Sequence, residues 1–139
     1  MKEGDTLMAG QRAGDFVLPK NTSQKIAWIA GGIGITPFRS QAQYLVDKQE
    51  KRDVVLFYSA SNPEAFAYKD VFARAESVGL RSLFLVTPTV DAIQKEIPDF
   101  KERVFYISGP NVMVEAYEQK LFSLGVPEKN VVTDYFPGF

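Results

Sequence analysis

The chain has 139 residues, of which 45% are hydrophobic and 24% are charged, and its formal net charge is −1. A length of about 150 residues fits one domain with a sizeable core, and the near-neutral charge argues against a nucleic-acid or anionic-membrane surface. The sequence contains no Cys and no His, which excludes disulfides, thiolate nucleophiles, Ser–His triads and most transition-metal sites within the chain. No apolar run approaches the roughly 20 residues of a membrane span, and the N-terminus lacks a signal-peptide pattern. We therefore expect a soluble, cytoplasmic chain whose chemistry, if any, uses carboxylates, hydroxyls, backbone amides or bound cofactors.

Five short apolar runs alternate along the chain with segments of helical spacing. Continuous apolar runs of this length are typical of strands that are buried on both faces of a parallel sheet. The runs are KIAWIA at 25–30, DVVLFYS at 53–59, RSLFLVT at 81–87, RVFYIS at 103–108 and NVVTDYF at 130–136.

The segments between the runs carry apolar stripes at helical spacing and signals for helix ends. Thr36-Pro37, Asn62-Pro63 and Gly109-Pro110 are typical of helix starts, and Gly125 followed by Pro127 is typical of a helix end. A shorter helix is expected over 90–97. The stripes are Phe38, Ala42, Leu45 and Val46; Ala67, Val71, Ala75 and Val78; and Val114, Tyr117, Leu121 and Leu124. The alternation predicts an α/β fold, a doubly wound five-stranded parallel sheet of order 3-2-1-4-5 with helices on both faces.

Residues 1–24 do not fit this alternation. The segment GDFVLP at 14–19 reads as a short strand with no partner in the α/β unit. We interpret 1–24 as the tail of a preceding domain and 25–139 as the α/β domain. The alternative is a simple N-terminal extension that adds an edge strand or lies on the surface.

A glycine-rich turn, AGGIGITP at 30–37, follows the first strand and opens the first helix. Glycines let the backbone approach pyrophosphate oxygens, and the helix N-terminus offers N–H groups with a partial positive charge. The turn is neither a P-loop nor a full GxGxxG fingerprint, and a tight turn needed only for packing is the alternative reading. The candidate nucleotide ligands here are Gly31, Gly32, Ile33, Gly34, Thr36 and Pro37.

A second glycine turn follows the fourth strand, and the predicted topology places it beside the first. Two glycine-opened helices that face one crevice suit an elongated ligand such as a dinucleotide better than a single phosphate. Ser108 ends this strand and is expected to face the crevice, or else to cap the next helix. Gly109, Pro110 and Asn111 complete the second half of the candidate site.

The loop after the second strand is the expected place of the adenosine ribose. NAD sites usually present an acidic residue there, and NADP sites an Arg. This loop has neither, so its polar candidates are Ser59, Ser61, Asn62 and, further on, Lys69. The loop has no nearby cation to meet a 2′-phosphate, which favours NADH over NADPH. Lys69 and Arg81 are the cations that could approach such a phosphate. Alternatively, Lys69 belongs to a solvated helix face.

Four segments together resemble the pyridine-nucleotide half of the ferredoxin–NADP⁺ reductase superfamily. They are GGIGITPFRS, LFYSASNPEAFAYKDVF, YISGPNVMV and the C-terminal DYFPGF, in family order and over nearly the whole chain. The early GDTLMAGQRAGDFVLP is similar to the last strand and exit of the family's flavin-binding β-barrel, whose Arg-x-Tyr-Ser motif is absent. The resemblance therefore implies the C-terminal part of a larger reductase that has a flavin-binding barrel in the same protein.

The resemblance also implies an activity, namely hydride transfer between NAD(P)H and FAD with electrons passed to an acceptor such as a ferredoxin, a haem or a membrane redox partner. In a membrane-bound relative this chain would be the cytoplasmic domain. The glycines at 31, 32 and 34 and Thr36 would bind the pyrophosphate. We expect the chain alone to bind no FAD stably, and expect Gly32→Val or Gly34→Val to abolish nucleotide binding with the fold largely intact.

Four further residues acquire roles from the resemblance. Ser108 stands where relatives often have Cys, close to the nicotinamide. Asp134 and Phe136 match a C-terminal acid–x–aromatic pattern whose ring stacks on the flavin, and Phe139 competes with Phe136 for that role; ordinary packing at a chain end is the alternative. Two other functions stay open, a non-catalytic nucleotide-binding or regulatory module and a flavodoxin-like FMN carrier, the latter disfavoured because no Ser/Thr-rich phosphate loop follows the first strand.

Overall fold

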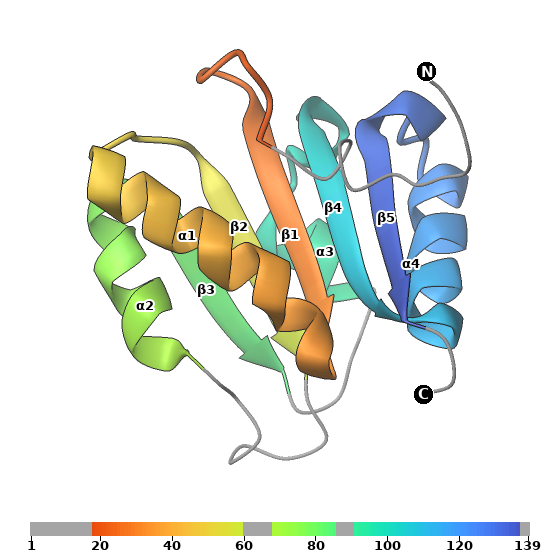
Figure 1. Ribbon diagram of the computed structural model, residues 1–139. Coiled ribbons are helices and arrows are strands. Elements are labelled where there is room, and N and C mark those ends of the chain that lie inside the picture. Colours follow the sequence, from red (N-terminus) through yellow and green to blue (C-terminus); the bar gives the residue numbers. More distant parts are fainter. Residues whose placement is uncertain (1–17, 60–67, 86–90, 137–139) are drawn as a thin grey trace, which may run out of the picture.

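A computed structural model describes residues 18–59, 68–85 and 91–136 of the chain. Its five strands form one sheet in the order β3-β2-β1-β4-β5, and every neighbouring pair is parallel (Figure 1). This confirms the predicted strand order. The strands are β1 Lys25–Gly31, β2 Val54–Ser59, β3 Leu80–Leu85, β4 Arg103–Pro110 and β5 Val131–Phe136.

Helices cover both faces of the sheet, as expected for a doubly wound fold (Figure 1). The helices α1 and α2 lie on one face, and α3 and α4 pack on the other. The α-helices are α1 Thr36–Lys48, α2 Lys69–Arg74, α3 Asp91–Glu96 and α4 Asn111–Ser123. Short 3-10 turns are η2 Gly32–Ile35, η4 Ala75–Val78, η5 Phe100–Glu102 and η6 Glu128–Asn130. None of the described helices is long and apolar enough to cross a membrane.

The central strands are buried on both sides, which is why their sequences read as continuous apolar runs. On the α1 face, the rings of Trp28 and Phe38 stack with centroids 5.1 Å apart and planes 20° apart, and both side chains are fully buried. On the opposite face, the neighbouring residue Ile29 joins Phe105 of β4 and Leu121 of α4 in a second cluster. Each central strand therefore contributes alternate residues to two separate cores.

Element ends differ from the sequence prediction by a few residues. Strand β4 runs two residues further than expected, so Gly109 and Pro110 belong to the strand and α4 begins at Asn111. Helix α1 begins at Thr36 itself, and its N-terminal flanking residue is Ile35 rather than Thr36. Helix α2 begins only at Lys69; the predicted start at 62–63 lies outside the described residues, as do 86–87 and 14–17, and residues 18–24 contain no strand.

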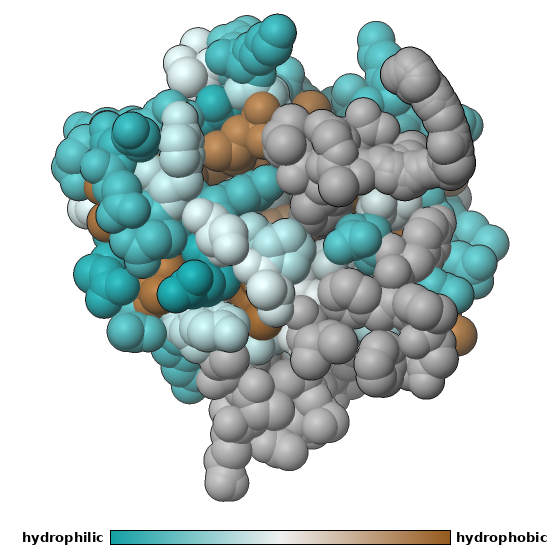
Figure 2. All heavy atoms as spheres, viewed as in Figure 1, coloured by the Kyte–Doolittle hydropathy of each residue, from teal (hydrophilic) through white to brown (hydrophobic). Residues whose placement is uncertain are grey.

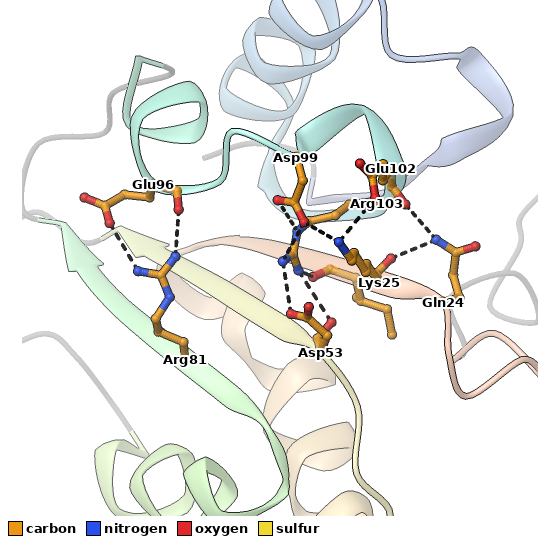
Figure 3. Close-up of polar contacts among 9 residues, drawn as sticks. Gln24, Lys25, Asp53, Arg81, Glu96, Asp99, Glu102 and Arg103 are labelled. Carbon is orange, nitrogen blue, oxygen red and sulfur yellow. Dashed lines mark hydrogen bonds and ion pairs between the residues drawn. The ribbon is translucent and has the colours of Figure 1, made fainter.

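A network of ion pairs ties together the strands' amino ends (Figure 3). The Arg103 guanidinium, on a side chain only 6% exposed, pairs with Asp53 at 3.0 Å and Asp99 at 3.2 Å and donates to the Ile26 carbonyl at 2.8 Å. Lys25 pairs with Asp99 at 2.9 Å. The hydrogen bond from Lys25, and then that from Arg103, holds the pKa of the Asp99 carboxyl below its usual value. Ion pairs therefore link the amino ends of β1, β2 and β4.

The outer face of α1 borders an open pocket of about 560 Å³, which also touches residues 18–22. Tyr44, 45% exposed, lines this pocket, as does Arg52, which is buried and pairs with Glu50 at 2.7 Å. Hydrophilic side chains dominate the described surface over α1 and α2, with small apolar patches between them (Figure 2). The pocket lies beside α1 and does not include the glycine turn.

Candidate functional site

The candidate site lies at the carboxyl edge of the sheet, between β1 and β4. The chain passes from β1 outward to β2 and β3 and then crosses to β4 on the other side of β1. In open α/β sheets, ligands bind in the crevice at such a reversal of strand order. Ala30 pairs with Ser108, so the turn after β1 and the end of β4 lie next to each other, as predicted.

Gly32 is the glycine that faces open space. Its φ is +56°, a left-handed conformation that residues other than Gly adopt only with strain, and a Cβ built on it would meet no atom of the described residues within 4 Å. The residue is exposed. A ligand oxygen can therefore approach the backbone at this position, which is what a phosphate cradle requires.

Gly34 and Gly31 have a different role, because both are packed against the second half of the site. A Cβ on Gly34 would overlap the Ser108 carbonyl oxygen and lie 2.9 Å from the backbone nitrogen of Gly109, and a Cβ on Gly31 would overlap the Met113 sulfur of α4. The expectation that Gly34→Val leaves the fold largely intact is therefore wrong: the clash involves backbone atoms of a central strand. Binding of pyrophosphate through the backbone of these glycines stays a prediction.

The last candidate ligands of the glycine-rich turn lie at the start of α1. Ile35 precedes the helix and is buried, the Thr36 side chain is exposed, and Pro37 occupies the first turn. The flanking residue makes no side-chain capping hydrogen bond. The N-terminus of this 13-residue helix carries a partial positive charge that favours an anion. The backbone of Ile33 lies within η2, and its role as a ligand is not tested.

Ser108 and Asp134 are direct neighbours on β4 and β5. The Ser108 hydroxyl is fully buried, and among the described residues it makes no hydrogen bond of standard geometry. Burial raises the pKa of the Asp134 carboxyl above its usual value, and the nearby Ser108 hydroxyl partly opposes this shift. A buried hydroxyl that makes no hydrogen bond of standard geometry among the described residues, and whose polar neighbour is the Asp134 carboxyl, fits a site where a ligand supplies a further polar contact.

The C-terminal aromatic candidates are only partly described. Phe136 is the last residue of β5, where its backbone pairs with Pro110 of β4. The end of β5 therefore lies beside the second glycine turn. Asn111 is exposed at the start of α4. Phe139 lies outside the described residues.

Ser59 is placed in the interior rather than in the crevice. It is 4% exposed, and its hydroxyl lies 3.5 Å from the Ala30 carbonyl oxygen. It also faces Tyr117 of α4: burial raises the pKa of the Tyr117 hydroxyl, and a hydrogen bond with Ser59 opposes that shift. Direct contact of Ser59 with a nucleotide remains a prediction. Ser61 and Asn62 lie outside the described residues.

The structure separates the two cations that the sequence singled out. Lys69 begins α2, and its Nζ lies 5.4 Å from the Phe84 ring centroid, close to the carboxyl end of β3. Arg81 lies near the amino end of β3, where it pairs with the Glu96 carboxylate at 3.2 Å and donates to the Glu96 carbonyl at 2.8 Å (Figure 3). The expectation that Arg81 could approach the nucleotide is therefore wrong.

Arg39 is a cation that the sequence analysis missed. It lies in the first turn of α1, and its guanidinium carbon is 5.5 Å from the centroid of the Tyr68 ring. Its spacing of three residues after Thr36 was the only available sequence signal, because the contact with Tyr68 is made by a residue 29 positions away along the chain.

Comparison with known proteins agrees with this geometry. The family model described as "Oxidoreductase NAD-binding domain" matches residues 28–96. Flavohemoprotein A from Dictyostelium discoideum is 28% identical over 98% of this chain and 36% of its own length. The flavohemoprotein from Bacillus thuringiensis subsp. konkukian is 29% identical over 98% of this chain and 38% of its own length. The chain thus spans well under half the length of these relatives.

A solved structure shows the same fold. The Amycolatopsis cytochrome P450 reductase superposes with a TM-score of 0.77 at 23% identity, covering 95% of this chain and 46% of that one. The strand order and the family model therefore agree. In its strand order, in the glycine turn at the carboxyl edge of the sheet and in the family model that matches residues 28–96, the chain is similar to an oxidoreductase NAD-binding domain, as the resemblance to the ferredoxin–NADP⁺ reductase superfamily implies.

Proposed function

We propose that this chain is the nucleotide-binding part of an NAD(P)H-dependent FAD oxidoreductase. Hydride would pass between NAD(P)H and FAD, and electrons would continue to a protein or haem acceptor. The observation that carries the proposal is the open turn at Gly32 next to the end of β4, at the reversal of strand order. Both relatives named above are flavohemoproteins, which supports a flavin partner and leaves the acceptor unassigned.

The residues present fit a bound nicotinamide dinucleotide. Gly32 leaves backbone open to a pyrophosphate, α1 directs its N-terminus toward the same place, and the buried Ser108 hydroxyl makes no hydrogen bond of standard geometry among the described residues. When bound, the nicotinamide and the flavin supply the hydride chemistry. The chain's own contribution is to hold the dinucleotide in position and to keep water away from the reacting ring.

We assign the nicotinamide end of the ligand to the β4–β5 side of the crevice. Ser108 would contact the carboxamide or the ring, and the neighbouring Asp134, whose pKa is raised by burial, would keep a proton to higher pH than an ordinary aspartate. Phe136 follows at the end of β5, and we propose that its ring, or that of Phe139, covers the flavin. The flavin itself would bind mainly to a barrel domain, of which residues 1–24 are the proposed tail.

We propose NADH as the preferred nucleotide and a cytoplasmic location. A 2′-phosphate is ordinarily met by an Arg or Lys cluster. Lys69 is engaged with the Phe84 ring and Arg81 is paired with Glu96 away from the crevice, which supports the preference. Losing one charge-assisted contact is worth about 1.5–3 kcal/mol, or roughly a tenfold to hundredfold preference.

The proposal is tested by calorimetric titration of the 139-residue chain with NADH and NADPH. We expect NADH to bind at least tenfold more tightly, and expect Gly32→Val to abolish binding because a side chain would fill the cradle. Gly125 is a matched control: its φ is +94°, and a Cβ there would meet only the flexible end of Lys101. Gly125→Val adds comparable backbone strain away from the crevice and should leave affinity unchanged.

Four results would each contradict a different part of the proposal. A parent chain that binds neither nucleotide would refute the function itself. Unchanged affinity in Gly32→Val would show that the turn serves only packing, and NADPH binding ten times more tightly than NADH would overturn the nucleotide preference. The purified chain should also be colourless, since the flavin would bind mainly to the proposed barrel domain. Stoichiometric flavin bound to this chain would contradict that assignment.

A further inference from the structure

The thioether of Met113 lies between the two glycine turns of the candidate site. Met113 is in the first turn of α4, which begins at the carboxyl end of β4 (Figure 1). A Cβ built on Gly31 would overlap the Met113 sulfur, and a Cβ built on Gly109 would lie 2.8 Å from the terminal methyl carbon of Met113 and 3.3 Å from its sulfur. Met113 therefore fills the space that side chains at these two glycines would occupy, and it lies against both halves of the site.

The Met113 side chain lies at the boundary between the core and the solvent. It is half-buried, and its buried side packs against the core cluster that contains Ile29. The preceding residue, Val112, is 77% exposed, whereas the following residue, Val114, is fully buried. The side chain is thus within reach of small solutes, although much of its surface is packed.

Sulfur chemistry in this chain is confined to methionine. The sequence has no Cys and three Met, of which Met1 and Met8 lie outside the described residues. Oxidation converts a flexible, apolar methionine into a polar sulfoxide and disrupts the packing around it. Within the part of the chain that the structure describes, Met113 is therefore the one place where an oxidant of sulfur can act, and it lies next to the proposed pyrophosphate cradle.

Oxidation at this position would act directly on the glycine turn. The sulfur already occupies the space beside the Gly31 backbone, so an added oxygen atom has room only if the side chain swings out or the turn shifts. The new oxygen is also polar, and it must reach water or a hydrogen-bond donor. Either movement changes the packing of Gly31, which directly precedes Gly32, the open residue with a left-handed backbone at the proposed cradle.

We propose that Met113 is an oxidation site through which peroxides control nucleotide binding. The inference rests on the proposed function and adds a regulation to it. The Met113 sulfur attacks one oxygen of hydrogen peroxide and the O–O bond breaks. The proton of the transferred hydroxyl joins the departing hydroxide to form water, so the thioether loses two electrons and becomes a sulfoxide while the peroxide is reduced. Methionine sulfoxide reductases, with two thiols as the reductant, return the sulfoxide to the thioether and release water.

The test treats the 139-residue chain with hydrogen peroxide, removes the peroxide and measures NADH binding by calorimetry. Peptide mass spectrometry gives the fractions of Met8 and Met113 that carry one added oxygen, and circular dichroism reports whether the treated chain is folded. We expect the dissociation constant of NADH to rise by about 5-fold to 150-fold when Met113 is fully oxidised, the usual range for coupling between two sites. Incubation with methionine sulfoxide reductases specific for each sulfoxide epimer, together with a dithiol, should restore the affinity of the untreated chain.

Three variants isolate the contribution of this one sulfur. Met113→Leu removes the oxidisable atom at similar side-chain volume, and its affinity for NADH should be the same before and after peroxide. Met8→Leu is the matched control, because it removes a thioether elsewhere in the chain and should respond to peroxide as the parent does. Met113→Gln places a polar side chain of similar length in the same space, and it should weaken NADH binding without any peroxide while the circular dichroism spectrum stays that of a folded chain.

The outcomes separate this inference from the proposed function. Unchanged NADH affinity in a chain whose Met113 is fully oxidised overturns the inference and leaves the function standing. An equal loss of affinity in peroxide-treated Met113→Leu also overturns it, because the damage would then lie elsewhere, and so does a treated parent chain that has unfolded or whose Met113 stays unoxidised while Met8 is converted. An untreated parent chain that binds no NADH refutes the proposed function, and the inference falls with it.

Discussion

Gly34→Ala adds a single methyl group where the glycine turn touches β4, and it should damage the fold far more than the same change at Gly32. The added Cβ would overlap the Ser108 carbonyl oxygen and lie 2.9 Å from the Gly109 nitrogen. Strand β4 is paired on both sides, with β1 and β5. These backbone atoms cannot move aside without disturbing the sheet.

The magnitudes follow from the two surroundings. Forcing an extra methyl group into a packed site costs about 1–3 kcal/mol, and we expect about 3 kcal/mol for Gly34→Ala because the opposing atoms are backbone. At Gly32 nothing lies within 4 Å of the added Cβ, so the cost is the left-handed strain alone, about 1–2 kcal/mol. With about 4 °C per kcal/mol for a chain of this size, melting temperatures should fall by roughly 12 °C and roughly 4–8 °C, respectively.

Urea and thermal unfolding, followed by circular dichroism, measure both costs, and an NADH titration of each folded variant measures binding. We expect Gly34→Ala to have the lower free energy of unfolding. We expect Gly32→Ala to lose more NADH affinity relative to the stability that it loses. Equal melting temperatures for Gly34→Ala and the parent would refute the assignment of Gly34 to packing. A Gly34→Ala variant that is fully stable but no longer binds NADH would reverse the roles given to the two glycines.

Three further predictions concern stability. Phe38→Ala should lower the unfolding free energy by about 3–5 kcal/mol, since it empties a fully buried site against Trp28; a loss under 1 kcal/mol in urea titration would contradict the stacked core. Arg103→Met should cost about 2 kcal/mol, less than a fully buried pair because its partner Asp53 is half-exposed, and unchanged unfolding would show that the network is dispensable. The pKa of the Asp99 carboxyl is lower in the folded state than its ordinary value of 3.8, so its ion pairs stabilise the fold above pH 3.8 and this stabilisation is lost as the pH falls through the lower folded-state pKa. Asp99→Asn should therefore make the free energy of unfolding fall less steeply with decreasing pH on the acid side. An equally steep fall in the variant would rule out this carboxyl as a cause.

The amino-acid sequence by itself predicts the architecture of this protein, for local physical reasons. The run IAWIA at 26–30 is apolar at every position, which favours a strand between two layers of helices, and β1 is buried on both faces. Proline and glycine at the segment ends mark where helices begin and end, within one or two residues for α1 and α4. The glycine turn after the first strand then locates the candidate site, since parallel strands bring their carboxyl ends to one edge.

The sorting of residues within that site depends on contacts that no local pattern encodes. Gly32 and Gly34 are two positions apart and look equivalent in sequence, yet one faces open space and the other meets Ser108, 74 residues further along the chain. Ser59 reads as a loop ligand, but its hydroxyl lies against the Ala30 carbonyl in the interior.

The charged groups show the same limit. Arg81 and Lys69 were equal candidates in sequence, and the structure places one beside Glu96 near the amino end of β3 and the other over an aromatic ring close to the carboxyl end. The contact of Arg39 with Tyr68 exists only because α1 and α2 pack against each other, which brings the guanidinium over the ring. Periodicity and turn chemistry are properties of neighbouring residues and can be read along the chain, whereas the burial and partners of a polar side chain are decided only when distant elements meet.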